Sequence, residues 1–155
     1  MKKLHRIINF IAWGILAAAF IHLCFKWESM PEITGVHFDD EGEFDVYASK
    51  KYVAYPYIVG IVFLLLLQLG DIAARKAKLG LKTNAKGESI LRDAIRGLLG
   101  LNKLFISGMA AYWSELVIYQ HSLTERAVMC GMLLLFVAFL TVCISAPILK
   151  IIFPQ

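Results

Sequence analysis

The sequence contains few cysteines, and their spacing does not fit a metal or redox site. There are three among the 155 residues, Cys24, Cys130 and Cys143, and no two of them form a Cys-x-x-Cys motif. All three lie within apolar stretches, where a thiol behaves as a small hydrophobic group. The cysteines therefore exclude a closely spaced cysteine metal centre and give no indication of the redox compartment.

Charge is also scarce. Only 18% of the residues are charged and 59% are hydrophobic, and the mean hydropathy is +0.65. Soluble domains are nearer half apolar and carry charges throughout, whereas here the charges fall in a few blocks. This pattern is typical of an integral membrane protein, whose spanning helices need about 20 mostly apolar residues. The net charge of +4 then reflects a cytoplasmic bias of Lys and Arg, and no nucleic-acid partner is expected.

Motifs of known catalytic sites are absent from the sequence. It contains no Gly-x-Ser-x-Gly, Walker or His-Glu-x-x-His motif, and no spaced pair of carboxylates lies within an apolar stretch. We therefore expect a non-enzymatic protein without a cofactor.

Four stretches of the sequence are long and apolar enough to form membrane-spanning helices. They cover about residues 7–25, 52–69, 98–119 and 127–153. A cleaved signal peptide is the alternative for the first stretch, because the three alanines at 17–19 would suit a cleavage site. The apolar run continues to Phe25, however, which favours an uncleaved helix. The expected fold is an all-α integral membrane protein with one four-helix domain.

The distribution of basic residues predicts how these helices are oriented. Lys2, Lys3 and Arg6 precede the first stretch, and residues 70–97 carry seven basic and three acidic side chains. Residues 26–51 carry three basic and seven acidic side chains. Because Lys and Arg are retained on the cytoplasmic side, both termini and the basic loop 70–97 are expected inside and the acidic loop 26–51 outside. The protein is thus expected to cross a plasma membrane several times, with anionic lipids near the basic loop.

The acidic loop contains a pattern typical of a β-hairpin. Residues 36–46 alternate apolar and polar side chains around a turn at 39–43, in which Gly42 supplies a positive φ. The predicted opposite pairs are Val36 with Val46, His37 with Asp45 and Phe38 with Phe44. An isolated hairpin is marginal in water, so its apolar face is expected to rest on the ends of the helices. The histidine–aspartate pair would brace the hairpin or face a ligand.

The spacing of this loop resembles a known bacterial family. The motif is Pro31-x-Ile33-x-x-x-His37-Phe38-x-x-x-Gly42-x-x-Asp45-x-x-x-Ser49-Lys50, framed by two apolar stretches. It is similar to the domain-of-unknown-function family 1648, the N-terminal domain of Sdp-type immunity membrane proteins, over about residues 7–75. A second proline of the usual motif is replaced here by Gly35 and Val36. The resemblance implies a bacterial plasma-membrane protein with an immunity or signalling function, in which the outer loop recognises a peptide, a toxin or a small ligand.

Ionisable side chains that are expected near the outer surface indicate a metal site. Zinc prefers nitrogen and oxygen ligands, which would come from His22, His37, Glu115 and His121. No close-spaced ligand pair supports this site, and paired or solvated side chains are the alternative. Calcium is a further alternative at residues 39–43, which supply carboxylates but lack the ligand order of an EF-hand loop. A zinc site would make the protein a small metal-dependent membrane enzyme or a transport subunit.

The third apolar stretch is the most polar of the four and continues a helical pattern over residues 89–101. Its polar side chains are Lys103, Ser107, Ser114 and Glu115. Small and polar residues at such spacing are typical of helix packing, and Lys103 is expected to snorkel toward the cytoplasmic headgroups. The alternative is a buried cation in a polar cavity, paired with Asn9, Gln68 or Asp71.

A small-residue pattern in the first stretch predicts a surface for partner helices. The pattern is Gly14-x-x-x-Ala18, and small residues let two helices approach closely in a membrane. A third function is therefore that of an assembly subunit, in a homo- or hetero-oligomer.

Overall fold

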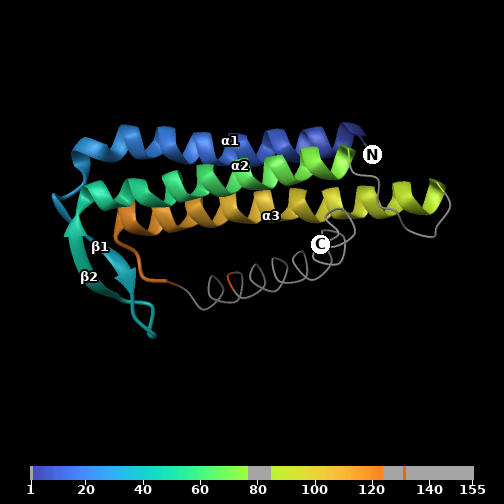
Figure 1. Ribbon diagram of the computed structural model, residues 1–155. Helices are drawn as coiled ribbons and strands as arrows, with labels where there is room; N and C mark the ends of the chain where they lie inside the picture. The colour runs from blue at the N-terminus through green and yellow to red at the C-terminus, as the bar shows by residue number, and fades with distance from the viewer. Residues whose placement is uncertain (1, 77–84, 124–130, 132–155) are drawn as a thin grey trace, which may run out of the picture.

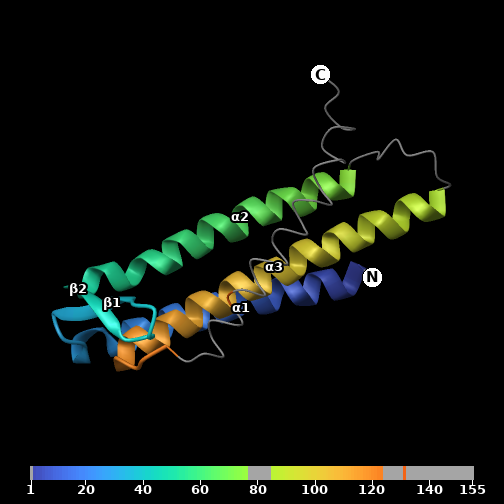
Figure 2. The same ribbon diagram turned by 90° about the horizontal axis from the view of Figure 1, so that it is seen from below.

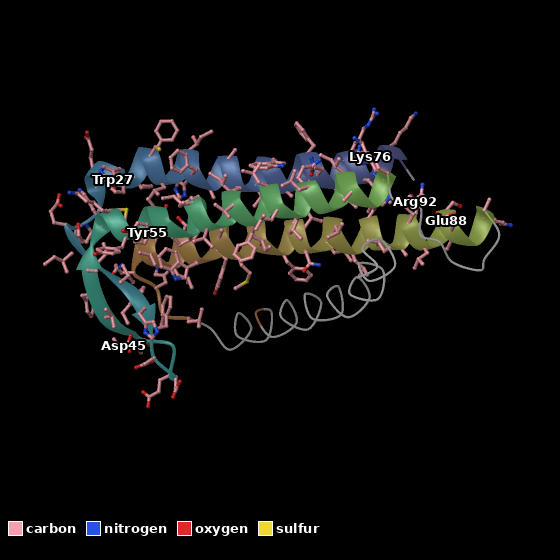
Figure 3. The ribbon with its side chains drawn as sticks, viewed as in Figure 1. Trp27, Asp45, Tyr55, Lys76, Glu88 and Arg92 are labelled. Carbon is pink, nitrogen blue, oxygen red and sulfur yellow. The ribbon has the colours of Figure 1, made fainter. Side chains whose placement is uncertain are left out.

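The computed structural model describes residues 2–76, 85–123 and 131 of the chain. The elements, in chain order, are α1 (Lys2–Lys26), the short 3-10 helix η1 (Trp27–Ser29), strands β1 (Ile33–Phe38) and β2 (Phe44–Ser49), a second 3-10 helix η2 (Lys50–Ala54), α2 (Tyr55–Lys76) and α3 (Ala85–Tyr119). The three long helices lie side by side, with the β1–β2 hairpin at one end and the N-terminus at the other (Figure 1). Figure 3 shows Asp45 at this hairpin end, and Lys76 and Arg92 at the opposite end, which we call the basic end.

Two of the described helical segments are long and apolar enough to cross a membrane. They are Lys3–Ser29 and Lys50–Lys76, each of which contains an 18-residue window with a mean hydropathy of 2.1, and they contain the first two predicted stretches. The third stretch, 98–119, is helical as predicted, but it is the C-terminal part of α3, whose polar side chains keep it below this apolarity. The fourth stretch, 127–153, lies outside the described residues except for residue 131. Within the described residues, two of the four expected spans are therefore supported.

Both segments between the first three apolar stretches contain regular structure. α2 continues to Lys76 and α3 begins at Ala85, so much of the segment 70–97 is helical, which confirms the helical pattern predicted over 89–101. The acidic loop 26–51 holds two paired strands, which confirms the predicted hairpin. The all-α description is therefore corrected to a helical protein with a small β-hairpin.

α3 is the central helix of the three. It packs along both α1 and α2, which contact each other much less, and Figure 2 shows α1 and α2 on either side of it. Glycines allow the helices to approach closely. A Cβ atom on Gly60 of α2 would lie 3.3 Å from Leu16 of α1. A Cβ atom on Gly100 of α3 would lie 3.0 Å from Ile8 of α1, so a larger residue there would push the two helices apart.

The helices bury polar side chains and expose apolar ones. On α1, Phe10 is 79% exposed and Phe25 is 82% exposed. On α3, by contrast, Lys103, Ser107 and Ser114 are all buried. Because these residues are spaced four and seven positions apart, they share one face of α3, and that face lies against α1 and α2. A helix on the surface of a soluble protein has the opposite arrangement, with its apolar face toward the core.

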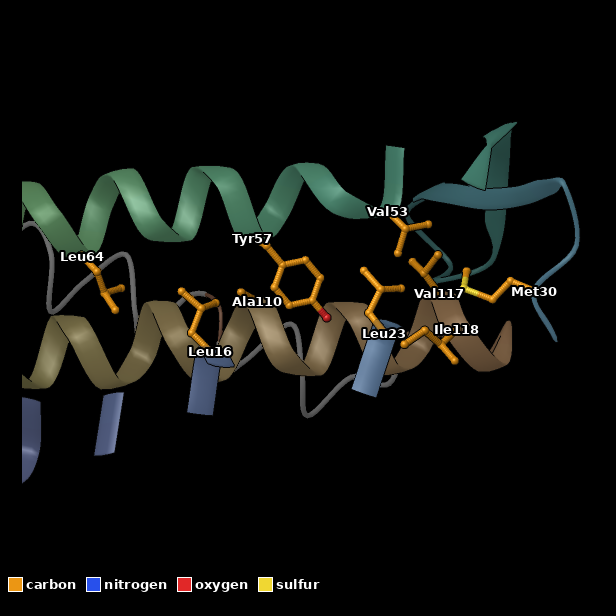
Figure 4. Close-up of a cluster of buried hydrophobic side chains, with 9 residues drawn as sticks. All are labelled: Leu16, Leu23, Met30, Val53, Tyr57, Leu64, Ala110, Val117 and Ile118. Atoms are coloured by element: carbon orange, nitrogen blue, oxygen red, sulfur yellow. The ribbon is translucent and has the colours of Figure 1, made fainter. Parts of the chain in front are cut away.

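An apolar cluster fills the half of the bundle nearest the hairpin (Figure 4). Its members are Leu16, Leu23, Met30, Val53, Tyr57, Leu64, Ala110, Val117 and Ile118. Met30 and Val53 belong to the segments on either side of the hairpin, so the cluster joins the hairpin to all three helices. Full burial of one such large side chain contributes about 1.5–3 kcal/mol.

The hairpin has the predicted Phe38–Phe44 pair but not the predicted neighbouring pairs. Phe38 lies opposite Phe44, and the two rings stack with their centroids 4.3 Å apart. His37 lies opposite Val46 instead of Asp45, because the ladder is irregular on both sides of His37. Such an irregularity leaves a residue unpaired and re-aims the side chains around it. Val46 is 48% exposed, so the apolar face predicted for the hairpin is incomplete.

Candidate functional site

The turn of the hairpin is closed by Asp39. Its Oδ1 accepts hydrogen bonds from the backbone N–H groups of Glu41 and Glu43, both at 2.9 Å. Gly42 has the predicted positive φ, at 84°, a conformation that glycine adopts at no steric cost. Two amides of the turn itself therefore bind Oδ1 of Asp39 and order the turn, while the calcium alternative stays a prediction.

Gln120 connects the end of α3 to the hairpin. Its backbone has a φ of 52°, and the N–H of His121 reaches back to the carbonyl of Leu116 at 2.9 Å, which is the Schellman ending of a helix. The side chain of Gln120 donates to the carbonyl of Val117 at 2.6 Å and accepts from the N–H of Gly35 at 2.9 Å. Gln120 carries no signal in the sequence, because glycine is the usual residue in this conformation.

Two further contacts hold the hairpin against the helices. The N–H of Leu123 donates to the carbonyl of Gly42 at 2.7 Å, and the ring of Phe44 packs against the buried apolar cluster. A Cβ atom on Gly35 would lie 2.3 Å from that ring, so only glycine lets Phe44 cross β1 at this point. The hairpin is therefore attached at its turn, at its middle and through its aromatic side chain.

The predicted pair of His37 and Asp45 forms at the surface of the hairpin. Nδ1 of His37 lies 2.7 Å from Oδ1 of Asp45, although the two residues are not opposite each other in the ladder. The side chains are 65% and 40% exposed. They are thus in contact with each other and also accessible from outside.

The remaining motif residues lie at the base of the hairpin. The backbone N–H of Lys50 donates to the carbonyl of Glu32 at 3.0 Å, and its Nζ lies 2.9 Å from the Glu32 carboxylate and over the ring of Trp27. Ser49 is opposite Ile33 in the ladder, and Pro31 is exposed. Lys50 therefore closes the hairpin base, which is a structural role.

A second polar cluster joins α1 to α3 at the hairpin end. Nδ1 of His22 lies 2.6 Å from Oε1 of Glu115, and the Tyr119 hydroxyl lies 3.3 Å from Nε2 of the same imidazole. The rings of Tyr119 and His121 stack with centroids 5.9 Å apart, and Nζ of Lys26 is 5.6 Å from the Tyr119 ring centre. Both ring nitrogens of His22 therefore have partners, in an order of carboxylate, imidazole and phenol.

Only part of the predicted zinc set is brought together. His22 and Glu115 are in contact, and His121 stacks on the Tyr119 ring beside them. His37, by contrast, is paired with Asp45 in the hairpin. Across residues 2–76, 85–123 and 131, no three His, Cys, Asp or Glu side chains gather in a way that could hold a metal ion. Zinc stays a prediction, for which His22 and Glu115 are the best-placed pair.

Tyr57 links all three helices in the apolar half of the bundle. Its hydroxyl lies 3.0 Å from the carbonyl oxygen of Ala19 and is also hydrogen-bonded to Ser114 Oγ. A carbonyl can only accept, so Tyr57 donates to Ala19 and Ser114 donates to Tyr57. Both hydroxyl groups are therefore hydrogen-bonded in the buried interior, where a polar group without a hydrogen-bond partner is costly.

Like Tyr57, Lys103 links all three helices, but it does so in the half of the bundle nearer the basic end. It is only 3% exposed, and its Nζ donates to Asn9 Oδ1 at 2.9 Å and to Gln68 Oε1 at 2.6 Å. The expectation that Lys103 snorkels toward the headgroups is therefore corrected: the side chain is a buried cation between one amide from α1 and one from α2. Both amides are among the partners predicted for the alternative of a buried cation.

A group of charged residues lies between Lys103 and the basic end. Nε of Arg96 donates to Oδ1 of Asp71 at 2.7 Å, and Nε of Arg75 donates to Oδ2 of the same carboxylate at 3.0 Å. Asp93 lies 3.6 Å from Arg96 and 3.7 Å from His5. Asp71 and Arg96 are 7% and 8% exposed, so this ion pair connects α2 and α3 inside the bundle.

An apolar groove of about 760 Å³ lies between α2 and α3, next to the hairpin. Val36 of β1, Tyr55 of α2, and Met109 and Trp113 of α3 are among its lining residues. A Cβ atom on Gly131 would lie 3.9 Å from the side chain of Met109. Gly131 therefore lies beside this groove.

Comparisons of the chain with protein-family models, with curated proteins and with solved structures gave no match. The resemblance of about residues 7–75 to family 1648 therefore stays a prediction based on the residue spacing of the motif at 31–50.

Proposed function

We propose that the chain is a multi-span protein of a bacterial plasma membrane, in which the outer β1–β2 hairpin recognises a peptide or a small ligand for an immunity or signalling role. The observation that carries this proposal is the attachment of the hairpin. Gln120, Leu123 and Phe44 hold it on the helix ends, while His37 and Asp45 face outward. Preorganisation of this kind favours recognition, because little conformational entropy is lost on binding.

The distribution of side chains supports insertion in a membrane. α1 and α2 would face lipid with their exposed apolar residues, and α3 would carry its polar face between them. Tyr52 and Tyr55 lie near the hairpin, whereas Arg75 and Lys76 end α2 at the opposite side, which fits an aromatic belt and a cytoplasmic basic end.

The topology is tested by cysteine labelling in cells, starting from a variant without the three native cysteines. Glu41→Cys in the hairpin turn and Lys86→Cys at the start of α3 are both exposed positions. A membrane-impermeant maleimide is expected to label Glu41→Cys in intact cells and Lys86→Cys only after permeabilisation. Labelling of Lys86→Cys in intact cells would contradict the proposed orientation.

Recognition is tested by survival of a sensitive bacterial host. Cells with the protein and cells with an empty vector are challenged with a panel of membrane-active peptides, and at least one peptide is expected to kill the protein-bearing cells less efficiently. The double variant His37→Ala/Asp45→Ala should lose this protection at an unchanged membrane level, while Lys76→Met should retain it. Equal killing with and without the protein across the panel, with the protein verified in the membrane, would reject the immunity role.

A further inference from the structure

We propose that the free edge of β2, meaning the side of this strand that faces away from β1, binds an extended and positively charged segment of a partner peptide. The bound segment would add a further strand to the hairpin. The inference rests on the proposed recognition function and states how the hairpin carries it out.

The first observation is the direction of the backbone groups along the hairpin. In an antiparallel ladder, opposite residues alternate between pairs that exchange hydrogen bonds and pairs whose N–H and C=O groups point away from each other. The N–H of Gly35 donates to Gln120 and not to β2, so Gly35 and the opposite residue Tyr47 form a pair of the second kind. The N–H of Lys50 donates to the carbonyl of Glu32, a bonded pair three positions away, which agrees with this alternation. Tyr47 therefore directs its N–H and C=O groups away from β1.

The same alternation directs the N–H of Ser49 away from β1, because Ser49 lies two residues after Tyr47 in the ladder. In the part of the chain that the structure describes, no backbone group of another element bonds to the free edge at Tyr47. β1 contacts α3 and η2, whereas β2 makes its main contacts with β1, and Figure 1 shows β2 on the side of β1 that is turned away from α3. Tyr47 is 60% exposed. The free edge is therefore accessible to another strand.

The second observation is that β2 lacks the residues that protect an exposed edge. Proteins prevent unwanted pairing at such edges with lysine, proline, bulges or a covering element. The strand Phe44–Ser49 contains neither lysine nor proline, and its one charged residue, Asp45, lies near the turn. The ladder irregularity also lies on the turn side of Tyr47, so the stretch from Tyr47 to Ser49 is regular. An uncovered edge of this kind binds extended peptides through main-chain hydrogen bonds.

The charge of the hairpin indicates the chemistry of the partner. Residues 26–51 carry seven acidic and three basic side chains. Within the described residues, the ion pairs of the hairpin use Glu32 and Asp45, which leaves the exposed side chains of Asp40, Glu41 and Glu43 at the turn without a basic partner. Opposite charges favour association and like charges disfavour it. A cationic peptide is therefore favoured over a second copy of this chain.

The test measures residue-resolved amide hydrogen exchange of the full chain in detergent micelles. The probe is a short peptide in which threonine and valine alternate between two terminal lysines. At saturating peptide, the N–H groups of Tyr47 and Ser49 are expected to exchange about tenfold more slowly, since each becomes hydrogen-bonded. The N–H of Ala48 is the internal control, because Ala48 lies opposite Thr34 in a bonded pair and its exchange should change less. The same peptide with terminal glutamates should bind about fivefold more weakly.

A pair of variants at one position separates the backbone from the side chain. Tyr47→Pro removes the outward N–H and no hydrogen bond of the ladder, a placement that an edge strand tolerates. Tyr47→Thr removes the same side chain but keeps the N–H. In a fluorescence anisotropy titration of the labelled lysine peptide, Tyr47→Pro is expected to bind about tenfold more weakly than Tyr47→Thr. The exchange of the Thr34 N–H, which reports on the ladder, should stay slow in both variants.

Three outcomes would overturn the inference. Equal affinities of the two variants, without protection at Tyr47 and Ser49, would mean that the hairpin binds peptide without strand pairing, and the recognition function would still stand. Absence of any binding of the lysine peptide would reject the edge as a binding site, while the survival assay decides the recognition function separately. Protection of Tyr47 that increases with protein concentration in the absence of peptide would assign the edge to a second copy of the chain.

Discussion

The two ends of the helix bundle use buried polar side chains in different ways. Near the hairpin, Tyr57 and Ser114 are neutral and share hydrogen bonds with a backbone carbonyl. Near the basic end, Lys103, Asp71 and Arg96 bring full charges between the helices. When one partner of a buried interaction is removed, the loss of stability depends on the group that remains. A buried charge without a partner costs more free energy than a buried hydroxyl without one. The basic end should therefore be the more sensitive of the two to single substitutions.

The largest effect is expected for Asp71→Ala. This variant leaves the guanidinium of Arg96, which is 8% exposed, with only the longer 3.6 Å contact to Asp93, and breaking a buried pair costs up to about 3–5 kcal/mol. The free energy of unfolding, measured by denaturant titration in detergent micelles, should fall by this order. The double variant Asp71→Leu/Arg96→Leu removes both charges and should recover most of the loss. If the double variant is no more stable than Asp71→Ala, the stranded charge is not the cause.

A smaller effect is expected for Tyr57→Phe at the opposite end. The variant keeps the buried ring but leaves the Ala19 carbonyl and the Ser114 hydroxyl without their partner, at a cost of about 1–3 kcal/mol. In a double-mutant cycle with Ser114→Ala, the two losses should not add, because both variants remove the same hydrogen bond. Additive losses in the same unfolding measurement would contradict the proposed chain of donors.

The smallest effect is expected for Asp45→Asn in the hairpin. Its partner His37 has a side chain that is 65% exposed, and exposed ion pairs contribute about 0–1 kcal/mol. The free energy of unfolding should therefore barely change. Gly35→Ala is the contrasting variant, because its Cβ atom would collide with Phe44, and overpacking costs about 1–3 kcal/mol. An equally large loss for Asp45→Asn would mean that the surface pair holds the hairpin together.

Patterns that depend on neighbouring residues could be predicted well. The helices at 7–25, 52–69 and 98–119 and the Phe38–Phe44 pair follow from the spacing of apolar and polar side chains, which is a local property. The contact between His37 and Asp45 was also predicted, although the ladder irregularity that permits it was not. Gln120 could not be predicted, because its role depends on the meeting of α3 with a strand that is 85 residues away in sequence.

Lys103 shows which properties are determined by the sequence and which by the tertiary structure. The sequence by itself determined that a lysine, a serine and small residues share one face of α3, since helical spacing alone decides this. Whether that face would meet lipid headgroups or other helices was decided only by the tertiary structure. Because α3 lies between α1 and α2, the face is covered, and Asn9 and Gln68 reach Lys103 from two different helices. The residue type set the charge of the Lys103 side chain, and the packing of segments that are distant in sequence set the surroundings of that charge.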